Sequence, residues 1–191
     1  MLDVAVQLYL FTTFFQNNSE SRNGKCTPLN FCSKSEKLGL EDGSIPDESL
    51  SASSNWDHID VSTPAGGRLK KKPPYPNIIG AWHPFVADTN QWIQVELGNP
   101  TYVTGVLTQG RYGGAPQWVT KYKVQYEPPS PACLVEVKDH LFQTQIFSGN
   151  FDRDSIVENH FFKPVLAVKI RIVPVEWNYA ITLRFELLGC K

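Results

Sequence analysis

Few side chains in this 191-residue sequence have the types and spacings that support catalysis. A hydrolase needs a nucleophile paired with a base, or two carboxylates in a cleft, and no G-x-S-x-G, H-E-x-x-H or phosphate-binding glycine motif occurs. The four histidines are scattered singly and there is no C-x-x-C pair, so a zinc site is not expected. We therefore expect a protein that is not an enzyme and that carries no cofactor.

The four cysteines have a spacing that suggests covalent cross-linking. Cys32 and Cys190 bracket almost everything that looks folded, and a bond between them would close a loop of 158 positions (190 − 32). In the chain-entropy model such a loop stabilises a fold by roughly 5 kcal/mol, and the bond belongs in an oxidising compartment. Cys26 and Cys133 remain as a candidate second pair, with a free thiol or an inter-chain bond as alternatives. Four cysteines allow three pairings, and the sequence alone does not choose among them.

The elements that must position these side chains are strands. Polar and apolar residues alternate in four segments, residues 92–97, 122–126, 168–172 and 183–187. This period of two is typical of strands with one face on a core. Breaks rich in glycine and proline separate the segments, and the chain has 14 Pro, 13 Gly and 12% aromatic residues. The pattern predicts an antiparallel β-sandwich or barrel.

Length and charge further limit the number of domains and the classes of function. A chain of this length suits one full-size domain, and the net charge of −1 argues against a general nucleic-acid binder. Residues 4–15 are apolar enough for the core of a signal peptide, but Asp3 stands where a basic residue belongs, so an upstream fragment is the alternative. A polar linker follows and contains the sequon at Asn17, which matters only if the chain is exported. We therefore divide the chain into an N-terminal segment with its linker, residues 1–31, and a domain, residues 32–190.

Ordered motifs along the domain resemble the discoidin family, also called the coagulation factor V/VIII C-type domain. They are LGLEDGSIPD (38–47), LSASS (50–54), GAW (80–82), QWIQVELG (91–98), TQGR (108–111), WVTKYKV (118–124), FSGN (147–150) and LRFELLGC (183–190). The resemblance implies an eight-stranded antiparallel, jelly-roll-like sandwich or barrel, in which Cys32 is bonded to Cys190 and hairpin loops called spikes bind the ligand at one end. Residues 127–134 depart from the family pattern, because prolines and Cys133 replace the usual Asp-Gly turn and Trp.

By the family pattern the first three spikes comprise residues 55–67, 83–90 and 111–117. An exposed Trp56 would be a natural anchor, with large area and little entropy to lose; the alternative is that it folds back to cap the barrel. The other tryptophans, Trp82, Trp92, Trp118 and Trp177, are expected in the core. The candidate ligand-binding residues are Trp56, Asp57, His58, Ile59, Phe85, Val86, Asp88, Arg111, Tyr112, Asn178 and Tyr179.

One basic run follows the first spike and consists of Arg68, Lys70, Lys71 and Lys72. It could meet sulfated glycans or anionic lipid headgroups, or it could be an ordinary solvated loop. Related sugar-binding domains hold a structural calcium near the chain ends. Asp47 and Glu186 are the carboxylates available for one, but no EF-hand-like ligand run supports it, and we expect no metal.

The resemblance implies an extracellular adhesion module, secreted or part of a larger cell-surface protein, that recognises a glycan or a matrix or cell-surface protein. Collagen is among the candidates, although His83 and Thr182 stand where the collagen receptors of the family carry an extra cysteine pair. The alternative is a module that binds phosphatidylserine membranes. Aspartates among the spike tips disfavour that alternative, because an anionic surface repels them.

Overall fold

The computed structural model describes residue 32 and residues 34–56, 63–72 and 80–190. The chain divides into two units, Met1–Asn30 and Phe31–Lys191, and every described residue belongs to the second. Several predictions made from the sequence therefore lie outside the described residues. They concern the signal-like segment, the sequon at Asn17, Cys26, and the first-spike residues Asp57, His58 and Ile59.

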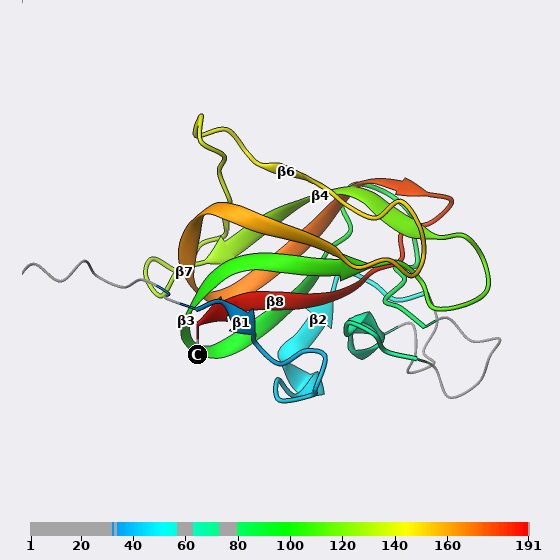
Figure 1. Ribbon diagram of the computed structural model, residues 1–191, viewed down its shortest axis with the longest axis horizontal. Helices are drawn as coiled ribbons and strands as arrows, with labels where there is room; N and C mark the ends of the chain where they lie inside the picture. Colours follow the sequence, from blue (N-terminus) through cyan, green and yellow to red (C-terminus); the bar gives the residue numbers. More distant parts are fainter. Residues whose placement is uncertain (1–31, 33, 57–62, 73–79, 191) are drawn as a thin grey trace, which may run out of the picture. The chain divides into compact units, whose positions relative to one another are not determined.

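Eight antiparallel strands make up the described domain, which confirms the predicted all-β class (Figure 1). They are β1 (Glu36–Lys37), β2 (Leu50–Ala52), β3 (Ile93–Gln109), β4 (Trp118–Glu127), β5 (Val135–Glu136), β6 (Ile146–Ser148), β7 (Val157–Asn178) and β8 (Arg184–Cys190). Two short 3-10 helices, η1 (Asp47–Ser49) and η2 (Pro64–Gly67), lie in the connections. No helix among the described residues is long and apolar enough to cross a membrane.

The two longest strands, β3 and β7, each take part in both layers of the sandwich. The first part of β3 pairs with β2 and with residues 169–172 of β7, where Ile93 lies opposite Ile172. Register shifts follow along β3, after which the strand pairs with β8 on one side and the first part of β7 on the other. Val106, for example, lies opposite both Leu187 and Asn159. Such irregularities bend a strand, so one strand can pass from one layer to the next.

The core follows the predicted alternation. The apolar members of the four predicted segments, such as Ile93 in β3, Tyr122 in β4, Ile170 in β7 and Phe185 in β8, are fully buried in one cluster. Of the tryptophans expected in the core, Trp82 is fully buried. Trp177 is partly buried against the same cluster, and Trp92 and Trp118 are half-buried.

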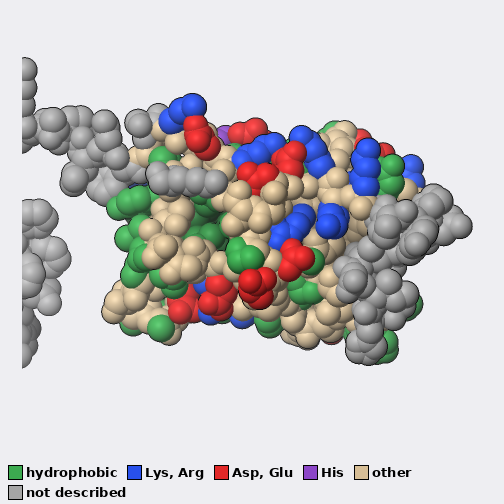
Figure 2. Space-filling model, turned by 90° about the horizontal axis from the view of Figure 1, so that it is seen from below, with side chains coloured by type: hydrophobic (Ala, Val, Ile, Leu, Met, Phe, Trp, Pro, Cys, Tyr) green, Lys and Arg blue, Asp and Glu red, His purple; other side chains and the backbone are tan. Residues whose placement is uncertain are grey.

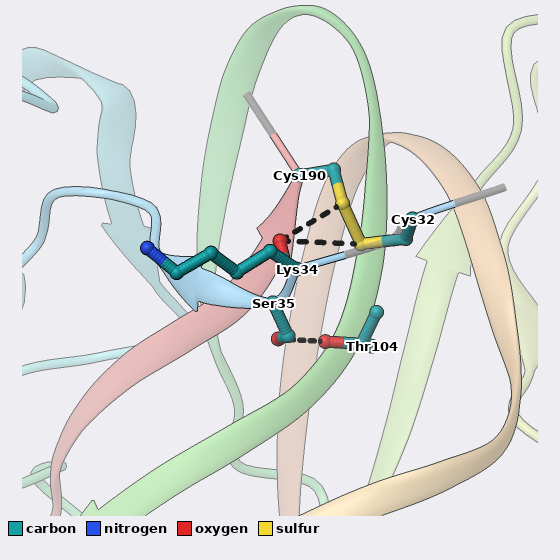
Figure 3. The surroundings of a disulfide bond; sticks show 5 residues. All are labelled: Cys32, Lys34, Ser35, Thr104 and Cys190. Carbon is teal, nitrogen blue, oxygen red and sulfur yellow. Dashed lines mark hydrogen bonds between the residues drawn. A yellow bond between two sulfur atoms is a disulfide. The ribbon is translucent and has the colours of Figure 1, made fainter. Parts of the chain in front are cut away.

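A disulfide joins the two ends of the domain, as the family resemblance implied. Cys32 is bonded to Cys190 at the end of β8, across 158 positions (Figure 3). Beside the bond, the carbonyl oxygen of Lys34 lies 3.2 Å from the Cys190 Sγ, and the hydroxyls of Ser35 and Thr104 share a hydrogen bond of 2.6 Å. These contacts hold the entering chain against β3 and β8.

The other described cysteine, Cys133, is exposed and has no disulfide partner among the described residues. It lies in the connection between β4 and β5, where the sequence departs from the family pattern. Since Cys26 lies outside the described residues, the pairing of these two cysteines stays a prediction.

Candidate functional site

An open pocket of about 310 Å³ lies between loops that are far apart in the sequence. Its lining combines aromatic, cationic and neutral polar side chains, namely Trp56, His83, Pro84, Phe85, Ala87, Arg111, Gln117 and Ala180. These residues come from the first three predicted spikes and from the connection between β7 and β8. The third spike and the β7–β8 connection lie at the right of Figure 1, at the end of the sandwich away from the C-terminus. We call this site the loop pocket.

Two exposed aromatic rings form one wall of the loop pocket. Trp56 and Phe85 are 53% and 64% exposed, and their ring centroids are 6.1 Å apart. The Trp56 ring also lies 5.0 Å from the His83 ring, centroid to centroid. The Trp56 backbone N–H donates to the His83 carbonyl at 2.7 Å, which joins the first two loops. Trp56 is thus an exposed side chain rather than a cap over the barrel.

A buried glutamine ties the first two loops together beneath this wall. Gln91 Oε1 accepts hydrogen bonds from the hydroxyls of Ser53 (2.7 Å) and Ser54 (2.8 Å), and its Nε2 donates to Asp88 Oδ1 at 2.9 Å. Ser54 in turn accepts from the Phe85 backbone N–H at 3.1 Å. Because these bonds cross between loops, they hold the aromatic wall in place before any ligand arrives.

Arg111 supplies the cationic side of the pocket. Its Nη1 donates to Gln117 Oε1 at 2.7 Å, whereas its Nε is buried and has no hydrogen-bond partner among the described residues. Burial, and secondarily the charge of Arg153, lower the pKa of the Arg111 guanidinium below its usual value. A side chain at Gly114 would bring its Cβ to 2.9 Å from Arg111 Nη2, so the glycine leaves room for the guanidinium there.

His83 is a neutral group at physiological pH. Burial, and secondarily the charge of Arg111, lower its pKa to about 4. Its Nδ1 is buried and unpartnered among the described residues. A neutral imidazole nitrogen can donate or accept a hydrogen bond. The pocket therefore presents a cationic side chain and a neutral imidazole beside an aromatic wall.

The remaining predicted residues divide between the pocket region and supporting roles. Tyr179 is 82% exposed and precedes the lining residue Ala180, and Val86 is exposed beside Phe85. Asp88 does not line the pocket, because its carboxylate accepts from the Asn90 N–H and from Gln91 within the loop network. Tyr112 and Asn178 also lie outside the lining. The Tyr112 ring packs under the Lys72 ammonium, and the Asn178 amide donates to the Pro116 carbonyl at 2.6 Å.

The predicted basic patch requires correction. Arg68 is 6% exposed and its guanidinium is bonded to Asp47 and to the carbonyls of Leu40 (2.9 Å) and Ile45 (2.7 Å). It is therefore a structural residue rather than a surface cation. On the face shown in Figure 2, basic and acidic side chains are interspersed rather than separated.

Of the three lysines in the patch, Lys70 is also engaged, since its ammonium pairs with the Glu41 carboxylate at 2.7 Å. Lys71 and Lys72 are exposed. The predicted run of four surface cations is thus reduced to two without a carboxylate partner in the part of the chain that the structure describes.

The two carboxylates considered for a structural calcium do not fit a cation. Glu186 is fully buried and its oxygens accept N–H bonds from Gly39, Leu40, Glu41 and Leu187. Asp47 binds the Arg68 guanidinium. A calcium site needs six or more oxygens free to face the ion. Across residues 34–56, 63–72 and 80–190, no group of three or more His, Cys, Asp or Glu side chains could hold a metal ion.

A β-sandwich with a preformed, open pocket between its terminal loops defines a ligand-binding module. The chain belongs to the F5/8 type C domain family, whose model matches residues 49–187. Domains of this family are typically non-catalytic binding modules, which agrees with the function expected from the sequence.

Lactadherin from Mus musculus is 38% identical over 161 residues, which are 82% of this chain and 34% of lactadherin. Retinoschisin from Takifugu rubripes is 33% identical over 183 residues, 94% of this chain and 63% of retinoschisin. Discoidin II from Dictyostelium discoideum superposes with a TM-score of 0.64 at 27% identity, covering 82% of this chain and 58% of that chain. The chain thus spans only about a third of the length of lactadherin.

The sequence did not single out His83, Gln91 or Gln117 as part of the site. His83 and Gln117 stand at the first position of the second predicted spike and the last position of the third. Residues at the bases of two loops lie close together when the strands that carry those loops are neighbours. The position of His83 and Gln117 at the base of a spike was therefore the signal in the sequence that could have placed them in the site. Gln91 follows the second spike, and nothing local distinguishes it from a solvated glutamine.

Proposed function

We propose that this domain is an extracellular adhesion module that recognises a glycan on a cell or matrix surface through the loop pocket. The observation that supports it is the convergence of the Trp56 and Phe85 rings with the polar side chains of Arg111 and His83 on one open pocket. The disulfide between Cys32 and Cys190 supports an extracellular location, because such bonds persist in oxidising compartments.

The chemistry of a sugar matches both sides of the pocket. A pyranose ring has an apolar face of C–H groups that can lie against an aromatic ring, and hydroxyls at its edge that need directional partners. The Arg111 guanidinium can donate to a hydroxyl oxygen, and the neutral His83 imidazole can donate or accept. At about 310 Å³ the pocket is at the small end of ligand sites, which suits one terminal sugar unit.

A site of this size and openness is expected to bind weakly. Adhesion would then depend on many domains or many glycans acting together, since linked binding events raise the effective concentration. The proposed ligand is therefore a densely displayed terminal sugar rather than a free monosaccharide.

The test is binding of the full chain to a panel of glycans ending in galactose or N-acetylgalactosamine, to fibrillar collagen and to phosphatidylserine vesicles. Trp56→Ala should lower glycan affinity by about 1–2 kcal/mol, or roughly tenfold, because it removes the larger ring of the wall. Ile146→Ala is the matched control, since Ile146 is 49% exposed but lies on β6 outside the pocket lining.

Glycan binding that Trp56→Ala weakens roughly tenfold and Ile146→Ala preserves would support the proposal. Binding to no glycan of the panel, together with collagen binding that depends on Trp56, would replace the glycan with a matrix protein at the same site. Glycan binding that survives both Trp56→Ala and Arg111→Gln would remove the loop pocket as the site.

A phosphatidylserine membrane is the second candidate ligand for this end of the domain. The observation in its favour is a set of exposed apolar side chains on the loops, Trp56, Phe85, Val86 and Tyr179. Membrane modules of this type need a basic collar as well, and here Arg68 is buried and Lys70 is paired. We therefore rank the glycan first.

A further inference from the structure

The charge of the loop pocket is carried by one side chain. Among the described residues that line the pocket, Arg111 alone is charged at physiological pH, because the others are apolar or, like Gln117 and the neutral His83, uncharged. The Arg111 Nη1 donates to the neutral Gln117 Oε1 at 2.7 Å, and no carboxylate in residues 34–56, 63–72 and 80–190 pairs with the guanidinium. The positive charge of the pocket is therefore not neutralised within the described domain.

A second guanidinium lies beside the first. The Arg153 Nη1 donates to the Gly114 carbonyl at 2.6 Å, and a Cβ at Gly114 would lie 2.9 Å from Arg111 Nη2, so both guanidinium groups meet at this glycine. Burial, and secondarily the charge of Arg153, lower the pKa of Arg111. An arginine side chain nevertheless stays protonated, so two positive charges lie next to each other at the third spike.

The described carboxylates nearest to these arginines already have partners. Asp88, next to the lining residue Ala87, accepts from the Asn90 N–H and from Gln91 in its own loop. Glu176, near the end of β7, binds a lysine of β4 at 3.0 Å. The Asp152 carboxylate accepts from the backbone N–H groups of residues 154 and 155 and from a serine hydroxyl. The charge of Asp154 acts on the buried guanidinium of Arg184, which does not line the pocket.

A guanidinium that lacks an anionic partner is matched best by a carboxylate. Its planar fork of N–H donors fits the two oxygens of a carboxylate, and such charge-assisted hydrogen bonds are about twice as strong as neutral ones. A sugar hydroxyl offers Arg111 only a neutral acceptor. An anion also reduces the repulsion between Arg111 and Arg153, which a neutral ligand leaves in place.

We propose that the loop pocket prefers a terminal pyranose that carries a carboxylate, as uronic and sialic acids do, with the carboxylate paired to Arg111 and Arg153 beside it. The C–H face of the same ring would lie against Trp56 and Phe85. This inference rests on the proposed glycan function and adds to it the charge of the sugar.

The test is binding of the full chain to polymers that display one sugar each at equal density. The sugars are galactose, galacturonic acid, its neutral amide, galactose 6-sulfate and N-acetylneuraminic acid. The first three differ only at C6, so they isolate the effect of the charge. At low salt, the wild-type chain should bind galacturonate about tenfold more tightly than galactose or the amide, and the preference should shrink as salt rises. The two acidic sugars distinguish a uronic from a sialic acid.

The variants assign the preference to residues. Arg111→Gln should remove the preference for the acidic sugar, Arg111→Lys should keep part of it, and Arg153→Gln should reduce it by about threefold. Lys163→Gln is the matched control, because it removes one positive charge from an exposed side chain outside the pocket lining. If Arg111→Gln fails to fold, the comparison of galacturonate with its amide on the wild-type chain still decides the question.

A preference for either acidic sugar that Arg111→Gln removes and Lys163→Gln preserves would support the proposal. Equal or tighter binding of galactose by the wild-type chain would overturn it and leave the glycan function intact. A preference that persists in Arg111→Gln would also overturn it, because the carboxylate would then be held elsewhere. Tighter binding of the 6-sulfate than of both carboxylates would overturn the assignment to a carboxylate. Binding to none of the polymers would count against the glycan function itself, and this inference would fall with it.

Discussion

Replacing Arg68 with methionine should destabilise the domain far more than any neighbouring change in the lysine run. Methionine keeps an unbranched apolar stem but removes the guanidinium that donates to the carbonyls of Leu40 and Ile45 and to Asp47. The variant therefore separates the hydrogen bonds of the guanidinium from the packing of its stem.

The size of the effect follows from which acceptors stay buried. A buried acceptor left without its donor costs about 1–3 kcal/mol, and Leu40 is fully buried while Ile45 is partly so. The ion pair with Asp47 adds little, because the Asp47 side chain is 65% exposed and exposed pairs contribute about 0–1 kcal/mol. These contributions predict that the free energy of unfolding falls by about 3 kcal/mol in Arg68→Met and by less than about 1 kcal/mol in Asp47→Asn.

Denaturant and thermal unfolding of the full chain measure both values. For a domain of this size 3 kcal/mol corresponds to a fall of roughly 6–12 °C in the unfolding midpoint. Lys71→Met is the control, since Lys71 is exposed and should change the midpoint by little. An Arg68→Met midpoint no lower than that of Asp47→Asn would refute the argument that the guanidinium organises the loop of residues 38–47.

The same experiment tests the absence of a calcium requirement. Because Arg68 and backbone N–H groups occupy the two candidate carboxylates, neither calcium nor a chelator should move the wild-type midpoint. A rise of several degrees with calcium would show that these carboxylates bind an ion after all.

Three further outcomes are expected. Between pH 6.5 and 4, His83 is protonated in the unfolded chain but stays neutral in the folded chain, because burial lowers its pKa to about 4. The free energy of unfolding should therefore fall as pH drops through this window, by on the order of 1–3 kcal/mol. His83→Gln should flatten that part of the pH profile in denaturant titrations, and an unchanged slope would contradict the burial of a neutral imidazole. Changing Cys32 and Cys190 together to serine should cost about 5 kcal/mol in unfolding free energy, and a loss under about 1 kcal/mol would show that the bond adds little. Gln91→Ala should weaken binding at the loop pocket about tenfold, because the first two loops lose their shared hydrogen bonds; unaltered affinity would mean that the loops are held in other ways.

The sequence determined the strands because their signal is local. A strand with one face on a core shows its period of two within five or six residues, and all four predicted segments lie in or overlap β3, β4, β7 and β8. A local pattern also predicted that Trp56 is exposed, because this tryptophan stands in a polar turn. The order of the motifs then indicated the family, and with it the bond between the chain ends.

The alternation of polar and apolar residues does not predict burial correctly where a strand is covered on both faces. In β8 the polar positions Arg184 and Glu186 are as buried as the apolar ones. Glu186 is covered by the backbone of residues 39–41, and the Arg184 Nε donates to the Gly110 carbonyl at 2.6 Å. Arg68, read from the sequence as a surface cation, is buried by the same kind of contact. The partners of Arg68, and those of Glu186 in residues 39–41, are 21 to 147 positions away, so no local pattern distinguishes such residues from solvated ones.

The loop pocket was decided by tertiary structure alone. The pocket combines side chains from position 56 to position 180, and they meet only because the strands beneath their loops are neighbours in the sandwich. Phe142 and Phe162 are likewise ordinary apolar residues in the sequence, and only the folded chain leaves both rings exposed to solvent beside Lys163. Periodicity fixes which residues face a core, whereas the partners of a surface residue depend on chain segments brought together by folding.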